Sequence, residues 1–171
     1  MNEEILRAVA PSKIGERMVS WNEVHEMSEN LARTIKKDFR PDVVISIASG
    51  GLVPGKLLKE MLGVKVMGVI SAHYYEKNGN KRKECLVEKV LSGFVPRHTD
   101  LNILLVDDIA DTGTTFREVL KALPDLLGHG EWSIKTASLL MKPHSAFVPD
   151  YYALEAEDWI VFPWEIGEVS V

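Results

Sequence analysis

The stretch Ile103-Leu-Leu-Val-Asp-Asp-Ile-Ala-Asp-Thr-Gly-Thr-Thr115 decides the fold of this chain and locates its candidate site. Its aliphatic start predicts a buried strand, and two adjacent carboxylates, Asp107 and Asp108, follow where that strand ends. The loop of small residues at 110–115 leads into a helical pattern, so backbone N–H groups and three Thr hydroxyls gather at a helix N-terminus, where anions bind. We therefore expect a ligand that presents a diol to the carboxylates and a phosphate to the loop.

Helices and strands alternate on both sides of this stretch. Ser20-Trp-Asn-Glu23 has the spacing of a capping box and predicts a helix over 22–38. The other predicted elements are strands at 43–48, 64–71, 101–109 and 134–141, helices at 52–62 and 114–123, and a lid or extended hairpin at 73–83. This alternation predicts an α/β fold with a mostly parallel, twisted sheet flanked by helices. We expect one domain over 1–171, with a core at about 19–148 and a small C-terminal hood at about 149–171, because the short aromatic pieces near the end do not continue the alternation.

The composition is that of an acidic chain with little cysteine. A formal net charge of −5 over 171 residues disfavours a broad basic surface for nucleic acid. The single cysteine, Cys85, cannot form an internal disulfide, and no apolar run approaches the roughly 18 residues of a membrane span. No leader pattern is visible at the N-terminus. We therefore expect a cytoplasmic protein that binds neither nucleic acid nor membranes.

Three loops follow predicted strands and carry most of the polar chemistry, at 49–51, 73–83 and 107–115. In open parallel sheets the ligand binds beyond the carboxyl ends of the strands. These loops are therefore expected to converge on one crevice.

Several motifs of the chain match one known family. They are Val106-Asp-Asp-Ile-Ala-Asp-Thr-Gly-Thr-Thr115, Ser49-Gly-Gly-Leu-Val-Pro-Gly55, Met141-Lys-Pro143 and Asp158-Trp-Ile-Val-Phe-Pro-Trp-Glu-Ile-Gly167. The first resembles the phosphoribosyl diphosphate signature of type I phosphoribosyltransferases, with Ala110 where a larger aliphatic residue is usual. The others are similar to the diphosphate loop, the purine-binding strand and the hood of the xanthine-guanine members. The resemblance implies a purine salvage enzyme that transfers a phosphoribosyl group from its diphosphate to a 6-oxopurine (guanine, xanthine or hypoxanthine), with Mg²⁺ present and pyrophosphate released.

The resemblance also implies a role for each motif residue. Asp107 and Asp108 would bind the ribose diol and Mg²⁺, and Asp111 would be the general base that removes the purine proton. A cis peptide bond is implied between Ser49 and Gly50. The residues expected to bind phosphoribosyl diphosphate are Ser49, Gly50, Gly51, Asp107, Asp108, Ala110, Asp111, Thr112, Gly113, Thr114 and Thr115. Those expected to bind the purine are Lys142, Trp159, Ile160 and Glu165.

Some of these residues have a purely structural alternative. The alternative for Asp111 is a helix N-cap, and for Trp159 and Ile160 it is packing within the hood. Lys142 is alternatively an ordinary lysine at a strand end. Ser49 stands where bacterial relatives have arginine or lysine. We therefore expect the cluster of Lys81, Arg82 and Lys83 to supply the missing positive charge at the diphosphate, the alternative being a solvated basic loop.

Two other functions fit part of the pattern. One is a non-catalytic regulator that senses phosphoribosyl diphosphate, which the acidic charge and the short segment before the first helix disfavour. The other is a type I transferase for another base, which Lys142 and the Trp159 hood disfavour. Relatives assemble as dimers or tetramers, so a homo-oligomer is expected.

Overall fold

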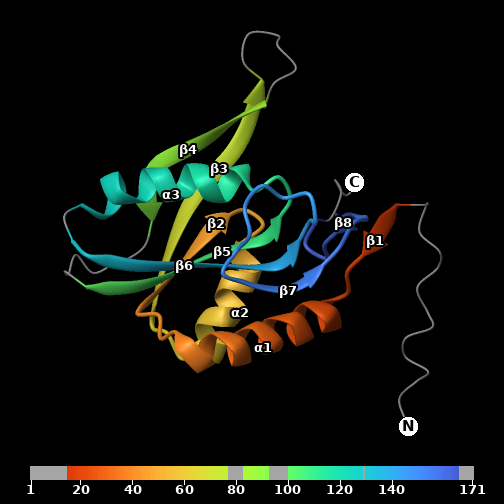
Figure 1. Ribbon diagram of the computed structural model, residues 1–171, viewed down its shortest axis with the longest axis horizontal. Coiled ribbons are helices and arrows are strands. Elements are labelled where there is room, and N and C mark those ends of the chain that lie inside the picture. Colours follow the sequence, from red (N-terminus) through yellow and green to blue (C-terminus); the bar gives the residue numbers. More distant parts are fainter. Residues whose placement is uncertain (1–14, 77–82, 93–99, 129, 166–171) are drawn as a thin grey trace, which may run out of the picture.

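A six-stranded sheet with helices on both faces forms the centre of the computed structural model (Figure 1). The structure describes residues 15–76, 83–92, 100–128 and 130–165. The elements follow the chain in the order β1 (Glu16–Met18), α1 (Trp21–Asp38), β2 (Val43–Ala48), α2 (Leu52–Leu62), β3 (Val66–Glu76), β4 (Lys83–Ser92), β5 (Leu101–Ala110), α3 (Thr114–Leu127), β6 (Trp132–Met141), β7 (Tyr151–Glu155) and β8 (Trp159–Val161).

The main sheet has the strand order β4-β3-β2-β5-β6-β7. All neighbouring pairs are parallel except β3 and β4, so the predicted α/β fold with a mostly parallel sheet is confirmed. β5 lies between β2 and β6, with Val43 opposite Ile103 on one side and Ile103 opposite Ile134 on the other. The strand that carries the two aspartates is therefore interior to the sheet, with neighbours on both sides.

Alternate side chains of β5 serve two different cores. Leu104 and Val106 pack with α1 and α2, whereas Ile103 and Leu105 pack with α3. Figure 1 shows α3 on one face of the sheet and α1 and α2 on the other. Side chains alternate across a strand, so a strand covered on both faces is apolar at successive positions. This explains the continuous aliphatic run that precedes the acidic pair.

The helix boundaries follow local signals in two cases and tertiary packing in a third. The Ser20–Glu23 capping box is present, and α2 ends at Gly63 in the left-handed conformation. α3 was predicted to end at residue 123, but it continues through Pro124 to Leu127. Leu127 is buried on the same face as Phe116, and burying its side chain favours the extra turn.

The polar segment after the third strand was predicted to be a lid or an extended hairpin. β3 pairs antiparallel with β4, so the expectation of a hairpin is confirmed. The hairpin is longer than the predicted 73–83, because β3 extends to Glu76 and β4, which was not predicted as a strand, extends to Ser92. Residues 77–82, including Lys81 and Arg82, lie outside the described part of the chain. Lys83 is the first residue of β4 and pairs in register with Glu76.

The predicted hood over 149–171 is wrong in its first part. Tyr151–Glu155 forms β7 and joins the main sheet parallel to β6, with Ala137 opposite Tyr151. Tyr151 is buried, and its hydroxyl donates to Asp38 of α1 at 3.0 Å. This anchor places β7 in the sheet although no helix separates it from β6. β8 instead forms a separate two-stranded sheet with β1, in which Arg17 lies opposite Ile160.

Within the described ranges, no helix combines the length and the apolar character needed to cross a membrane.

Candidate active site

The acidic pair lies among the last four residues of β5, close to its carboxyl end. Asp107 and Asp108 are buried, with 8% and 9% of their surfaces exposed. The backbone N–H of Asp108 donates to the Asp107 carboxylate at 3.0 Å. In the part of the chain that the structure describes, no Lys, Arg or His forms an ion pair with either carboxylate. The described residues therefore supply no positive charge that would compensate ionisation of this buried pair.

This environment disfavours ionisation of both carboxyls. Burial raises the pKa of Asp107 well above its usual range, and the charge of Asp108 raises it further. Burial is also the main cause that raises the pKa of Asp108 to about 6, with a smaller contribution from the charge of Glu165. The Ile109 N–H and the Trp164 indole lower the Asp108 pKa by favouring its anion. A cation bound here would offset this repulsion and desolvation.

The β2–α2 loop lies directly against the acidic pair. A Cβ atom on Gly50 would be 2.1 Å from Oδ2 of Asp108, and one on Gly51 would be 2.4 Å from the Val106 carbonyl oxygen. Only glycine permits this approach of backbone to the site. The expected cis peptide between Ser49 and Gly50 is wrong by one position, because the cis bond joins Ala48 and Ser49. Ser49 is exposed, beside the acidic pair.

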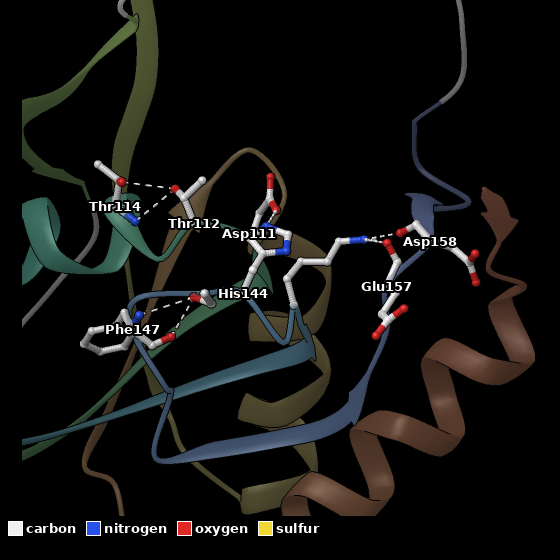
Figure 2. Close-up of polar contacts among 9 residues, drawn as sticks. Asp111, Thr112, Thr114, His144, Phe147, Glu157 and Asp158 are labelled. Atoms are coloured by element: carbon white, nitrogen blue, oxygen red, sulfur yellow. Dashed lines mark hydrogen bonds and ion pairs between the residues drawn. The ribbon is translucent and has the colours of Figure 1, made fainter.

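The β5–α3 loop forms the other wall of the site. Gly113 has a φ of 75°, and a Cβ atom there would be 2.4 Å from Cβ of Phe147, so two constraints require glycine. Oγ1 of Thr112 accepts from the Thr114 N–H at 3.3 Å and donates to Oγ1 of Thr114 at 3.0 Å (Figure 2). The turn therefore holds its hydroxyls at the N-terminus of α3.

The alternative interpretation of Asp111 as a helix N-cap is wrong. The N-cap residue of α3 is Gly113, which makes no side-chain capping bond. The Asp111 carboxylate instead lies 3.1 Å from Nε2 of His144 (Figure 2). Because the loop turns through Gly113 before the helix begins, the carboxylate is left on the exposed side of the loop.

Two cavities meet at the acidic pair. One, of about 520 Å³, is lined by the whole stretch from Asp107 to Phe116. The other, of about 590 Å³, is lined by the β2–α2 loop together with Trp164 and Glu165. Both include Asp107, Asp108 and Thr115. An elongated ligand with anionic ends would thus extend from the α3 N-terminus past the carboxylates to the β2–α2 loop.

The residues predicted to bind the purine differ in burial and do not all line the same cavity. Lys142 is buried, and its Nζ donates to the backbone carbonyls of Glu157 and Asp158 (Figure 2). Trp159 is 71% exposed, whereas the side chain of Ile160 is buried in the core beneath α1.

Glu165 lies beside the acidic pair. It lines the second cavity, and its Oε2 accepts from the Phe162 N–H at 2.8 Å. Among the described lining residues, Lys142, Trp159 and Ile160 belong to neither of the two cavities.

Known proteins resemble this chain in sequence and in fold. The sequence profile of the phosphoribosyl transferase domain matches residues 13–170. The chain belongs to the phosphoribosyltransferase family. This transferase is 30% identical to the xanthine-guanine phosphoribosyltransferase of Chromohalobacter salexigens over 90% of this chain and 86% of the relative. It is 28% identical to that of Gluconobacter oxydans over 94% and 91%.

A solved structure extends the likeness to three dimensions. The purine phosphoribosyltransferase of Pyrococcus horikoshii Ot3 has a TM-score of 0.76 and 34% identity, covering 92% of this chain and 99% of the other. The predictions of the family, the fold class and an enzyme that transfers a phosphoribosyl group in purine salvage are confirmed. The roles of the individual site residues stay predictions.

Two residues near the site of this transferase were not identified from the sequence. His144 contacts Asp111, although it stands alone in a turn and has no motif around it. Trp164 stacks on Phe162 at 4.6 Å. Its buried Nε1 lies within hydrogen-bonding geometry of no acceptor among the described residues. The indole is nevertheless close enough to Asp108 to lower the pKa of that carboxyl. Trp164 belongs to the hood motif at 158–167, but the sequence did not predict that it packs beside the acidic pair.

Proposed function

We propose that this transferase moves the phosphoribosyl group of 5-phosphoribosyl 1-diphosphate to guanine, xanthine or hypoxanthine and releases pyrophosphate. The observation that carries the proposal is the buried acidic pair at the junction of two cavities. One cavity ends in a helix N-terminus suited to a phosphate, and the other in a glycine loop suited to a diphosphate.

The proposed binding mode follows from this order of groups. The 5′-phosphate would bind the Thr112–Thr115 turn, whose N–H groups and hydroxyls surround the N-terminus of α3. Asp107 and Asp108 would accept hydrogen bonds from the ribose diol. The diphosphate would lie along the backbone of Ser49, Gly50 and Gly51.

Mg²⁺ fits the chemistry of these donors. Magnesium prefers oxygen ligands and retains several waters, so a few carboxylates together with substrate oxygens are sufficient. Within the described chain, no group of three or more His, Cys, Asp or Glu side chains could hold a metal by itself. We propose that Asp107 and Asp108 share Mg²⁺ with the substrate, where the ion would supply charge stabilisation for the departing diphosphate.

The proposed chemistry uses side chains on both sides of the ribose. As the bond from C1′ to the diphosphate oxygen breaks, positive charge develops on the ribose, and the buried carboxylates stabilise it. Asp111 would accept the proton of the purine ring nitrogen as the new bond from C1′ to nitrogen forms. A general base in this position contributes roughly 10²–10⁴ in rate.

The proposed selection of a 6-oxopurine depends on Lys142. Its ammonium already donates to two carbonyls of the β7–β8 connection, and one of these contacts would be exchanged for the exocyclic oxygen of the base. Adenine has an amino group there and offers no acceptor in exchange for that carbonyl contact, which disfavours its binding. Exposed Trp159 would stack on the purine, while the backbone of Ile160 and the side chain of Glu165 would contact its far edge.

Three further parts of the proposal concern charge, location and assembly. Lys81, Arg82 and Lys83 would supply the positive charge that Ser49 does not. Replacing all three with alanine should raise the KM for phosphoribosyl diphosphate, and an unchanged KM would refute their role.

A cytoplasmic location and a homo-oligomer stay predictions, which cell fractionation and light scattering would test.

The decisive experiment follows pyrophosphate release with Mg²⁺, phosphoribosyl diphosphate and one base at a time. We expect release with at least one of guanine, xanthine and hypoxanthine and none with adenine or orotate. Binding of phosphoribosyl diphosphate without release for any base would instead favour a regulator. A matched pair of variants sharpens the result: Asp111→Asn should lose turnover, whereas Asp125→Asn, an exposed carboxylate on α3, should not.

A further inference from the structure

The contact between Asp111 and His144 joins two loops that are distant in sequence. Asp111 belongs to the β5–α3 loop and His144 to the β6–β7 loop, and their side chains lie together beside the phosphate-binding turn (Figure 2). Nε2 of His144 is 3.1 Å from Oδ1 of Asp111. An ionised carboxylate only accepts hydrogen bonds, so the imidazole Nε2–H is the donor.

The backbones of the two loops are connected on both sides of this contact. The Lys142 N–H donates to the Ala110 carbonyl at 3.0 Å, and the Ala146 N–H donates to the Thr112 carbonyl at 3.2 Å. These bonds flank Asp111 on one loop and His144 on the other. The backbones that carry the imidazole and the carboxylate are therefore held at a fixed separation.

Aromatic packing holds the same arrangement from the other side. Phe147 stacks on Phe116 of α3 with ring centroids 5.2 Å apart, and its backbone lies against Gly113. The Ser145 hydroxyl donates to the Phe147 carbonyl at 2.8 Å. His144 thus sits on a turn that is tied to the N-terminus of α3.

The contact itself contributes little to stability. The side chains of His144 and Asp111 are 65% and 56% exposed, and exposed pairs of this kind are worth little. An Asp111 carboxylate without this donor would be free to change rotamer in solvent. The effect of the imidazole is therefore on the orientation of the carboxylate.

We propose that His144 is a positioning residue that orients the Asp111 carboxylate for proton removal from the purine. The inference rests on the proposed function, in which Asp111 is the general base. The imidazole occupies Oδ1 and leaves Oδ2 available. During transfer, the purine nitrogen bonds to C1′, the bond from C1′ to the diphosphate oxygen breaks, and the purine proton moves to Asp111.

Steady-state kinetics with a double-mutant cycle test this role. His144→Ala should lower kcat about five- to tenfold, as expected for loss of one hydrogen bond, with the KM for phosphoribosyl diphosphate unchanged. His144→Gln, whose amide places a donor close to the position of Nε2, should recover most of the rate. In an Asp111→Asn background, His144→Ala should lower kcat less than about twofold further, because coupled residues are not additive.

A second histidine provides the matched control. Nε2 of His25 lies 3.5 Å from Glu29 on α1, in an exposed pair outside the site, and His25→Ala should leave kcat unchanged. The inference is overturned if His144→Ala keeps the full rate, if His144→Gln is as slow as His144→Ala, or if the two losses multiply in the double variant. A wild-type protein that releases no pyrophosphate with any purine would overturn the proposed function and this inference together. An active wild type with an unaffected His144→Ala variant would overturn the inference alone.

Discussion

Replacing Asp108 with asparagine should stabilise the ligand-free protein while removing its activity. The wild-type carboxylate is 9% exposed, and its pKa is about 6 instead of the ordinary 3.8. At neutral pH the folded protein therefore holds an anion that the unfolded chain solvates better. The difference between the two values corresponds to about 3 kcal/mol in the free energy of unfolding from Asp108 itself. Removing its charge also relieves the repulsion that raises the pKa of Asp107.

The gain should appear only above a defined pH. Below about pH 4 both states of the wild type are protonated at Asp108, so Asp108→Asn should have little effect there. Between about pH 4 and pH 6 the unfolded chain has lost this proton and the folded protein still holds it. Wild-type stability therefore falls as pH rises through this window, and the advantage of the variant grows until it is complete above about pH 6.

Urea unfolding at pH 4 and at pH 7.5 measures this difference directly. Asp125→Asn is the control, because its carboxylate is exposed and its removal relieves no burial. With Mg²⁺ and phosphoribosyl diphosphate, the wild type should gain stability and Asp108→Asn should gain much less, because the ligand binds the intact pair. An Asp108→Asn protein that is less stable than wild type at pH 7.5, or a difference that does not change with pH, would refute the reasoning.

The other predictions concern the loop, the lysine and the metal. Gly113→Ala should lower the free energy of unfolding by about 1–3 kcal/mol and raise the KM for phosphoribosyl diphosphate, because its Cβ atom would be 2.4 Å from Cβ of Phe147 at a φ of 75°; an unchanged unfolding curve would contradict the close packing. Lys142→Met keeps the length of the side chain but removes the donor, and it should raise the KM for the preferred 6-oxopurine by about 10- to 100-fold; a similar change in the KM for phosphoribosyl diphosphate would argue against a specific contact with the base. Chelation of divalent cations should stop pyrophosphate release and readdition of Mg²⁺ should restore it, and full activity in excess chelator would exclude the proposed metal.

The strongest sequence predictions were those that depend on local patterns. The capping box at Ser20, the helix end at Gly63 and the buried strand before Asp107 all depend on residues close in the chain, and the structure contains each of them. Strand β7 was missed because its place depends on contacts with β6 and on the Tyr151 hydroxyl bound to Asp38, which no local pattern encodes.

The candidate site divides in the same way. Asp107, Asp108 and the Thr112–Thr115 turn lie within one continuous motif, so their order along the chain also determined their order in space. The side-chain partners did not follow from that motif. Asp111 contacts His144 rather than capping α3, and Glu165 lines the cavity that contains Asp108.

By itself, the sequence determined an α/β sheet, the strand that ends in an acidic pair and the family to which the chain belongs. These properties depend on hydrophobic periodicity and on the chemistry of contiguous residues. The burial that raises the pKa of Asp108, the approach of Gly50 to that carboxylate and the pairing of His144 with Asp111 were decided only by the tertiary structure. Each depends on the distance between atoms from different loops, and that distance is defined only once the strands have taken their places in the sheet.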